Sequence, residues 1–148
     1  MKNLFYRFVY NLAKLYWCIF KPKTQGARTV ILAENKVLLI KHIYYGSWVF
    51  PGGGIKGGEE PIEAGIREVK EEVGIVLEKP ILVGSFVNNN EGKIDTVFVF
   101  YKILDKIPVV VLDKKESTEY KWFDIGEEIP LGSVNTKIWE MVKEKVKI

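Results

Sequence analysis

The first 25 residues, here called the N-terminal arm, are mostly apolar, and polar side chains interrupt them at intervals of three or four. The polar positions within the first turns are Asn3, Arg7, Asn11 and Lys14. This spacing places them on one face of a helix and leaves a wide, aromatic-rich apolar face. Because Pro22 cannot continue a helix, the pattern predicts an amphipathic helix that ends before this residue.

Short apolar runs with a β-type composition follow the arm. They span residues 29–32, 37–43 and 48–50. A turn-like segment at 34–36 joins the first two runs, and a glycine-rich loop at 51–58 follows the third. The pattern predicts a β-hairpin that leads into the loop.

A helix bracketed by proline and glycine is predicted in the middle of the chain. Pro61 suits a first helical position and Gly74 a helix end, which predicts a helix over residues 60–73. The remaining elements are strands near 80–88, 94–103 and 119–123 and a helix near 134–146. Strands and helices mixed in this order predict a layered α/β or α+β domain over residues 26–148.

Length and composition fit one folded domain of this kind. The chain has 148 residues, of which 47% are hydrophobic and 28% charged, close to the globular average. Its single cysteine, Cys18, excludes an intramolecular disulfide, which favours a reducing compartment and predicts a cytoplasmic protein. Its single histidine, His42, excludes a zinc site built from several histidines and is interpreted as a structural residue of a strand.

Charge is distributed unevenly along the chain. The formal net charge is +3, but the arm holds five bases and no acid, while the rest holds 17 bases and 19 acids. Without bulk positive charge outside the arm, no nucleic-acid partner is expected. Arg7 and Lys14 argue against a membrane-spanning helix. Residues 1–22 therefore have two interpretations: burial against protein, including a homodimer, or peripheral contact with an anionic membrane.

The helix predicted over residues 60–73 carries acids opposite its apolar face. The apolar face consists of Ile62, Ile66, Val69 and Val73. Glu68, Glu71 and Glu72 lie on the other side, where like charges three or four residues apart destabilise a helix by roughly 0.2–0.5 kcal/mol per pair. An isolated cluster of this kind usually faces water. Here Arg67 offsets only one charge, so the cluster indicates a hard divalent cation, Mg²⁺ or alternatively Mn²⁺.

A longer pattern surrounds these glutamates and has the spacing G-x5-E-x7-R-E-U-x-E-E-x-G-U, in which U is aliphatic. Its specified positions begin with Gly53, Glu59 and Arg67 and continue through the segment 68–75. The pattern resembles the Nudix box, and every specified position matches. Over about residues 28–146 the chain is therefore similar to the Nudix (MutT-like) hydrolases.

The resemblance implies an α/β/α sandwich around a mixed β-sheet, to which the arm adds an N-terminal amphipathic helix. It also implies an enzyme that uses metal-activated water to hydrolyse the pyrophosphate bond of a nucleoside diphosphate linked to another group. The metal ligands that it implies are Glu68, Glu71, Glu72 and the carbonyl oxygen of Gly52. The general base would be one of these glutamates or a loop carboxylate, with Arg67 and Glu59 orienting and supporting the cluster.

Other candidate residues lie outside the box. The resemblance also implies an additional carboxylate from a loop before the last strand, for which Glu116 and Glu119 are the candidates. The candidates for phosphate contact or base stacking are Arg28, Lys41, Tyr45 and Trp48, although aromatic residues beside a loop also serve as packing. Two other functions remain as alternatives: a Nudix-fold module that binds a nucleotide without cleaving it, and a hydrolase of a lipid-linked diphosphate at a membrane.

Overall fold

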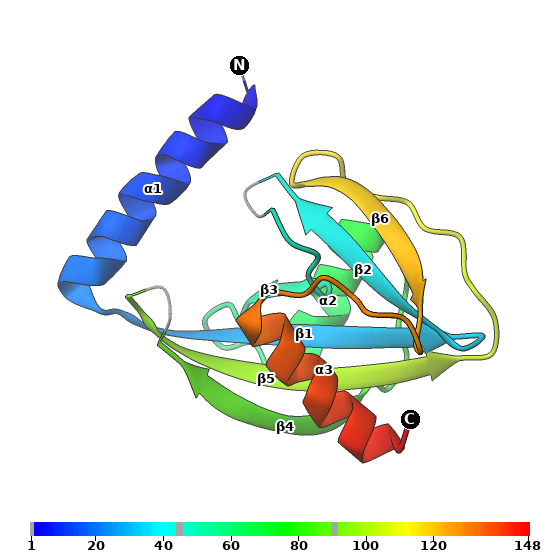
Figure 1. The fold of residues 1–148 in the computed structure, drawn as a ribbon. Coiled ribbons are helices and arrows are strands. Elements are labelled where there is room, and N and C mark those ends of the chain that lie inside the picture. The colour runs from blue at the N-terminus through cyan, green and yellow to red at the C-terminus, as the bar shows by residue number, and fades with distance from the viewer. Residues whose placement is uncertain (1, 44–45, 90–91) are drawn as a thin grey trace.

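Three layers make up the body of the protein. In this computed structural model, which describes residues 2–43, 46–89 and 92–148, a mixed six-stranded sheet lies between helices α2 and α3 (Figure 1). The α/β/α sandwich expected from the sequence is therefore confirmed. The helices are α1 (Lys2–Phe20), α2 (Pro61–Val73) and α3 (Ser133–Val146). The strands are β1 (Lys23–Ala33), β2 (Lys36–His42), β3 (Gly52–Gly54), β4 (Ile81–Asn88), β5 (Ile94–Leu104) and β6 (Ser117–Asp124).

The central strand β1 has different partners on its two edges. It runs parallel to β5 along its whole length, from Lys23 to Ala33. On the other edge β2 pairs with the last two residues of β1, and β3 pairs with its first part, where Arg28 lies opposite Gly52. This arrangement places the backbone of the glycine-rich loop directly beside β1.

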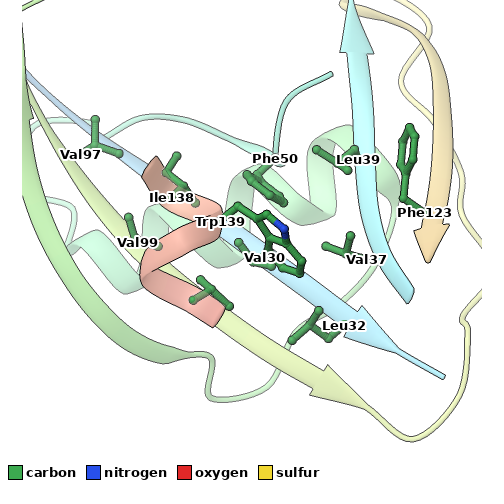
Figure 2. Packing of buried hydrophobic residues seen from close by; sticks show 11 residues of the cluster. Val30, Leu32, Val37, Leu39, Phe50, Val97, Val99, Phe123, Ile138 and Trp139 are labelled. Carbon is green, nitrogen blue, oxygen red and sulfur yellow. The ribbon is translucent and has the colours of Figure 1, made fainter. Parts of the chain in front are cut away.

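The sheet buries apolar side chains on both faces, as strands covered by helices on each side must. Alternate residues of β1 face different layers, because Val30 packs with residues of α3 and Ile31 with residues of α2. Figure 2 shows the α3 side, where Ile138 and Trp139 lie in the same cluster as Val30. Burial of each such side chain stabilises the fold by about 1.5–3 kcal/mol, so these two clusters hold α2 and α3 on the sheet.

Local interactions explain the bounds of α2. The N–H of Glu60 donates to Oε2 of Glu63 at 3.0 Å, and Pro61 occupies a position where an N–H would have no helical partner. At the other end Gly74 is left-handed, with φ 70°, and its N–H donates to the carbonyl of Lys70 at 3.1 Å. The helix therefore occupies nearly the same range that the sequence predicts.

Two strands differ from the sequence prediction. β1 begins at Lys23 rather than near Thr29, because its first residues pair with β5, with Lys23 opposite Ile94. β3 lies within the segment expected to be a loop, and its backbone pairs with β1. Neither segment has the apolar alternation of a strand, so the pairing partner rather than local propensity makes each one a strand.

Helix α1 extends from one end of the body (Figure 1) and leaves apolar side chains in contact with solvent. Only Lys21 and Pro22 separate it from β1, and Lys21 is left-handed, with φ 43°, where the helix ends. Within the described residues, no helix combines the length and the apolar character that crossing a membrane requires. The exposed apolar side chains of α1, such as Phe8 and Leu12, are not buried in the core of the domain.

Candidate active site

Carboxylates from two parts of the chain line a single cavity of about 420 Å³. Glu68, Glu71 and Glu72 reach it from α2, and Glu116 reaches it from the segment before β6. The backbone of β3 forms another part of its wall. The glutamates of α2 meet β3 because α2 contacts both β1 and β3. Glu116 joins them because its segment is hydrogen-bonded to the end of α2, where the N–H of Asp113 donates to the carbonyl of Glu72 at 2.8 Å.

Arg67 connects the charged face of α2 to the loop that precedes the helix. Its guanidinium donates to both carboxylate oxygens of Glu59, from Nε at 2.7 Å and from Nη2 at 3.0 Å. Nη1 donates to Glu68 at 2.6 Å and to Glu71 at 3.3 Å, while Nη2 also donates to the carbonyl of Gly54 at 3.0 Å. The hydrogen bonds from Arg67 lower the pKa of Glu59 to about 2, and the bond to Glu59 in turn raises the pKa of Arg67. One cation thus orients two glutamates of the cluster.

Glu72 is buried at the centre of the cluster, with 5% of its surface exposed. Its Oε2 accepts a hydrogen bond from the N–H of Gly52 at 2.7 Å, and its Oε1 lies 3.4 Å from Nε2 of His42. Burial raises the pKa of Glu72 to about 8, although the positive charge of Arg28 acts in the opposite direction. Ionisation of Glu72 therefore costs free energy when no cation is bound.

The structure separates the two candidates for an additional carboxylate. Glu116 lines the cavity, and its pKa is raised by partial burial and then by nearby acids, of which Glu68 has the largest effect. Glu119 instead forms an ion pair with Lys41 at 2.9 Å in an exposed part of the sheet. Glu116 is thus the candidate that lies beside the glutamates of α2.

The donor set of this cavity suits a hard divalent cation. Carboxylate and backbone carbonyl oxygens are the ligands that Mg²⁺ and Mn²⁺ prefer. Burial is the largest cause of the raised pKa values of Glu72 and Glu116, and the charges of neighbouring acids raise both further. The described side chains do not form a preassembled group of three acidic, histidine or cysteine ligands. Arg67 holds Glu68 and Glu71 in their present positions, and the N–H of Gly52 holds Glu72.

Two glycines allow the loop to approach its neighbours closely, Gly53 the helix α2 and Gly52 the strand β1. A Cβ atom on Gly53 would lie 2.5 Å from the carboxyl carbon of Glu68, which no neighbouring side chain could tolerate without moving. Gly52 has φ 147°, and a Cβ atom there would overlap the carbonyl oxygen of Ala27. Gly52 therefore requires glycine, whereas a side chain at Gly53 would displace the Glu68 carboxylate from its present position.

A second cavity, of about 270 Å³, shares His42 with the first and is also lined by Arg28. Nη1 of Arg28 is buried, and it has no hydrogen-bond partner among the described residues. A buried donor left unpaired costs on the order of 1–3 kcal/mol. This N–H group is therefore suited to an oxygen atom of a bound molecule.

The other candidates for substrate contact lie away from the glutamates or outside the described residues. The ring of Trp48 packs edge-on against Phe123, with centroids 5.1 Å apart, and Nζ of Lys41 lies 5.6 Å from the centre of the Trp48 ring. Neither Trp48 nor Lys41 is among the described residues that line the two cavities. Tyr45 lies outside the described residues. Of the four candidates, Arg28 is the one that the structure places beside the carboxylate cluster.

His42 contacts the cluster, although the sequence indicated only a structural role. Its Nε2 faces Oε1 of Glu72, and its Nδ1 lies 3.2 Å from Oγ of Ser117 and 3.3 Å from the carbonyl oxygen of Glu116. Burial, followed by the charge of Arg28, lowers the pKa of His42 and favours the neutral ring.

The strand pattern contained a signal for this contact. Leu38 and Ile40 belong to the apolar cluster that packs against α2. Because successive side chains of a strand alternate between the two faces, His42 lies on the same face as these residues. The alternation of side chains along β2, combined with the packing of α2 on this face of the sheet, therefore predicts that His42 lies near the acidic helix.

The comparisons with known proteins agree with this fold. The family model described as NUDIX domain matches residues 22–144. The chain therefore belongs to the Nudix family, as its resemblance to the box implied, and is classed with the hydrolases of this family.

Two curated relatives and one solved structure illustrate the similarity. The chain is 30% identical to diphosphoinositol polyphosphate phosphohydrolase 3-alpha from Mus musculus, over 78% of this chain and 71% of that protein. It is also 30% identical to ADP-ribose pyrophosphatase from Methanocaldococcus jannaschii, over 74% of this chain and 66% of that protein. The crystal structure of a MutT protein from Methanosarcina mazei is similar with a TM-score of 0.71 and 25% identity, covering 85% of this chain and 97% of that one.

Proposed function

We propose that the protein hydrolyses the pyrophosphate bond of a nucleoside diphosphate linked to another group. The observation that carries this proposal is the convergence of the α2 glutamates and Glu116 on one cavity beside the backbone of β3. A module that only binds a nucleotide would have no need of so many carboxylates in one cavity, since their mutual repulsion is costly.

Mg²⁺ or Mn²⁺ is the cofactor that the donor set of the cavity supports. The ligands would be Glu68, Glu71, Glu72 and the carbonyl oxygen of Gly52, with Glu116 as a further ligand. Such an ion, when bound, neutralises phosphate oxygens and increases the acidity of water. Arg67 and, through it, Glu59 would keep the glutamates of α2 turned toward the cavity.

The side chains around the cavity would position the substrate and accept a proton. Arg28 would donate from its unpaired Nη1 to a phosphate oxygen. A carboxylate would take a proton from the water that attacks phosphorus, as the bond from this phosphorus to the bridging oxygen breaks. Glu72 and Glu116 are the candidates for this base, because both line the cavity.

The second cavity would hold the group that the diphosphate carries. The names of the two relatives above refer to a diphosphoinositol polyphosphate and to ADP-ribose. A polyphosphorylated ring requires many cations around it, whereas the charged residues that line this cavity are Arg28 and Lys93 with the acid Asp95, among the described residues. The balance of charge therefore supports a nucleoside diphosphate derivative as the substrate class.

We place this activity in the cytoplasm, because the single cysteine, Cys18, cannot form an intramolecular disulfide. Fractionation of cells that express the full chain measures the compartment in which the protein is found. Recovery from an extracellular or periplasmic fraction would contradict it.

The proposed activity is tested with purified full-length protein, Mg²⁺ or Mn²⁺, and a panel of nucleoside triphosphates, ADP-ribose, nucleotide sugars and diphosphoinositol polyphosphates. We expect phosphate-bearing products from at least one nucleoside diphosphate derivative. Glu72→Gln should lower turnover by about a hundredfold or more, because it removes a charged ligand and a candidate base. Glu140→Gln, which changes an exposed acid of α3, should not.

Two results would contradict the proposal in different ways. Unchanged metal-dependent turnover in Glu72→Gln would reject the role given to this residue. Tight binding of a nucleotide without any cleavage across the panel would favour the non-catalytic module.

A further inference from the structure

The apolar face of α1 is exposed to solvent in this structure. The side chains that form it are Phe5, Phe8, Leu12, Leu15, Tyr16 and Ile19, each exposed by 51–66%. At 3.6 residues per turn they occupy a sector of about 100° around the helix. Apolar area of this extent on one helix face is typical of a surface that binds a partner.

The two sides of α1 have different surroundings. Tyr10, on the side of the helix opposite the apolar sector, lines the cavity that holds the glutamates. Nζ of Lys14 lies 4.9 Å from the centre of the Tyr10 ring. The apolar sector therefore points away from the catalytic cavity, so that a partner could cover it without closing the cavity.

The charge of the arm determines the chemistry of this partner. The arm holds five bases and no acid, and the described cations Lys14, Lys21 and Lys23 are exposed or largely exposed. A helix is about 10 Å across, which is close to the Debye length at physiological ionic strength, so cations on any side of it still attract an anionic surface beneath it. We infer that α1 docks the protein on the surface of an anionic lipid bilayer, with its apolar sector inserted among the acyl chains and its cations near the lipid phosphates.

A second copy of the chain fits the arm less well. Pairing two arms along their apolar sectors would bury apolar area, but it would bring no negative charge to the five cations of each arm. A bilayer instead supplies both an apolar layer and negative charge. Since no described helix has the length and apolar character to span a membrane, the docked α1 lies in the plane of the surface.

The short connection between α1 and the sheet gives this docking a consequence for the site. Residues 21 and 22 alone join the end of α1 to the start of β1, a distance of at most about 10 Å. The catalytic domain would therefore be held close to the bilayer rather than on a flexible tether. This docking does not depend on the proposed hydrolysis, because it involves a different face of the protein.

Sedimentation with vesicles tests the inference on the full chain. The probes are vesicles of phosphatidylcholine alone and vesicles with three parts phosphatidylcholine to one part phosphatidylglycerol. We expect binding to the anionic vesicles that weakens with salt and binding to neutral vesicles that is at least about tenfold weaker. Leu12→Glu places a charge in the centre of the apolar sector and should lower the partition constant by at least about tenfold.

Asn11→Glu is the matched control, because it adds the same charge one residue away but outside the apolar sector. It should retain most of the binding, and both variants should keep the wild-type circular dichroism spectrum. Equal binding of Leu12→Glu and Asn11→Glu, or equal binding to neutral and anionic vesicles, would overturn the inference. So would the absence of vesicle binding together with a dimer in analytical ultracentrifugation that Leu12→Glu dissociates.

Discussion

Helices α1 and α2 are both amphipathic, yet their apolar faces have opposite surroundings. Val69 and Val73 of α2 are completely buried against the sheet, whereas Phe8 and Leu12 of α1 are 61% and 51% exposed. Helical periodicity groups the apolar residues of each helix on one face. In α2, however, Ile62 of this face is 39% exposed, and Glu72, assigned to the opposite side, is buried. Periodicity does not say whether anything covers a face, which depends on where the rest of the chain lies.

The polar faces of the two helices differ as well. On α2, Arg67 and the N–H of Gly52 bind the glutamates and tie the helix to β3. On α1, the cations of the arm have no acid within the arm to neutralise them. Substitutions should therefore affect stability and catalysis strongly on α2 and weakly on α1.

The largest effect expected is on the pH dependence of stability, and its source is the buried carboxyl group of Glu72 on α2. Burial raises the pKa of Glu72 from 4.5 to about 8, so between these pH values the folded protein binds more protons than the unfolded chain. The free energy of unfolding of metal-free protein should therefore fall as the pH rises from about 4.5 to about 8, by on the order of a few kcal/mol. Urea denaturation with a chelator at pH 5 and at pH 8 measures this fall.

Glu72→Gln should remove most of this pH dependence because the side chain can no longer ionise. Glu144→Gln on α3 changes an exposed acid and should preserve it. A fall of the same size in both variants would show that Glu72 is not its source.

The next effect compares the apolar faces directly. Val69→Ala should lower the free energy of unfolding by about 2 kcal/mol, since it leaves a cavity in the core. Leu12→Ala should lower it by less than about 0.5 kcal/mol, because Leu12 is exposed. Denaturant titrations of both variants give the two values. Similar losses would mean that α1 is covered in solution.

A smaller effect is expected where α2 contacts the loop. Arg67→Lys keeps the charge but loses the paired hydrogen bonds to Glu59, so kcat/KM should fall by about tenfold to a hundredfold. Lys70→Gln, which alters an exposed cation of the same helix, should leave kcat/KM close to the wild-type value. If the two variants behave alike, Arg67 does not orient the cluster.

The smallest effect concerns the residue that the sequence did not assign to the site. His42→Ala should lower kcat by about tenfold with little change in KM, because Glu72 loses a neighbour that fixes its position. His42→Gln can still hydrogen-bond and should recover part of this loss. Lys36→Ala on the same strand is the control. A wild-type kcat in His42→Ala would return this residue to a purely structural role.

Much of the fold followed from local patterns. The ends of α2 were predictable because Pro61 and Gly74 act within one helical turn. The strand over residues 94–104 was predictable from its apolar run. The three glycines of β3 and the polar start of β1 carry no strand pattern, because in these segments pairing with a neighbouring strand creates the structure.

The site was predictable only in part, for a similar reason. The box identified the glutamates of α2 and the cation Arg67, since their spacing is local. The choice of Glu116 over Glu119 required the position of β6 beside β2, which pairs Glu119 with Lys41 and leaves Glu116 at the cavity. Arg28 was a candidate in the sequence, but its unpaired Nη1 emerged only from its packing.

The sequence by itself determined which residues share a helix face, where α2 begins and ends, and that the acids of α2 belong to a Nudix box. These properties depend on residues a few positions apart, whose relation follows from helical geometry. Only the tertiary structure decided that His42 meets Glu72, that Glu116 joins the cluster and that the apolar face of α1 is uncovered. These properties depend on which distant segments pack together, and the local periodicity of the sequence contains no information about this packing.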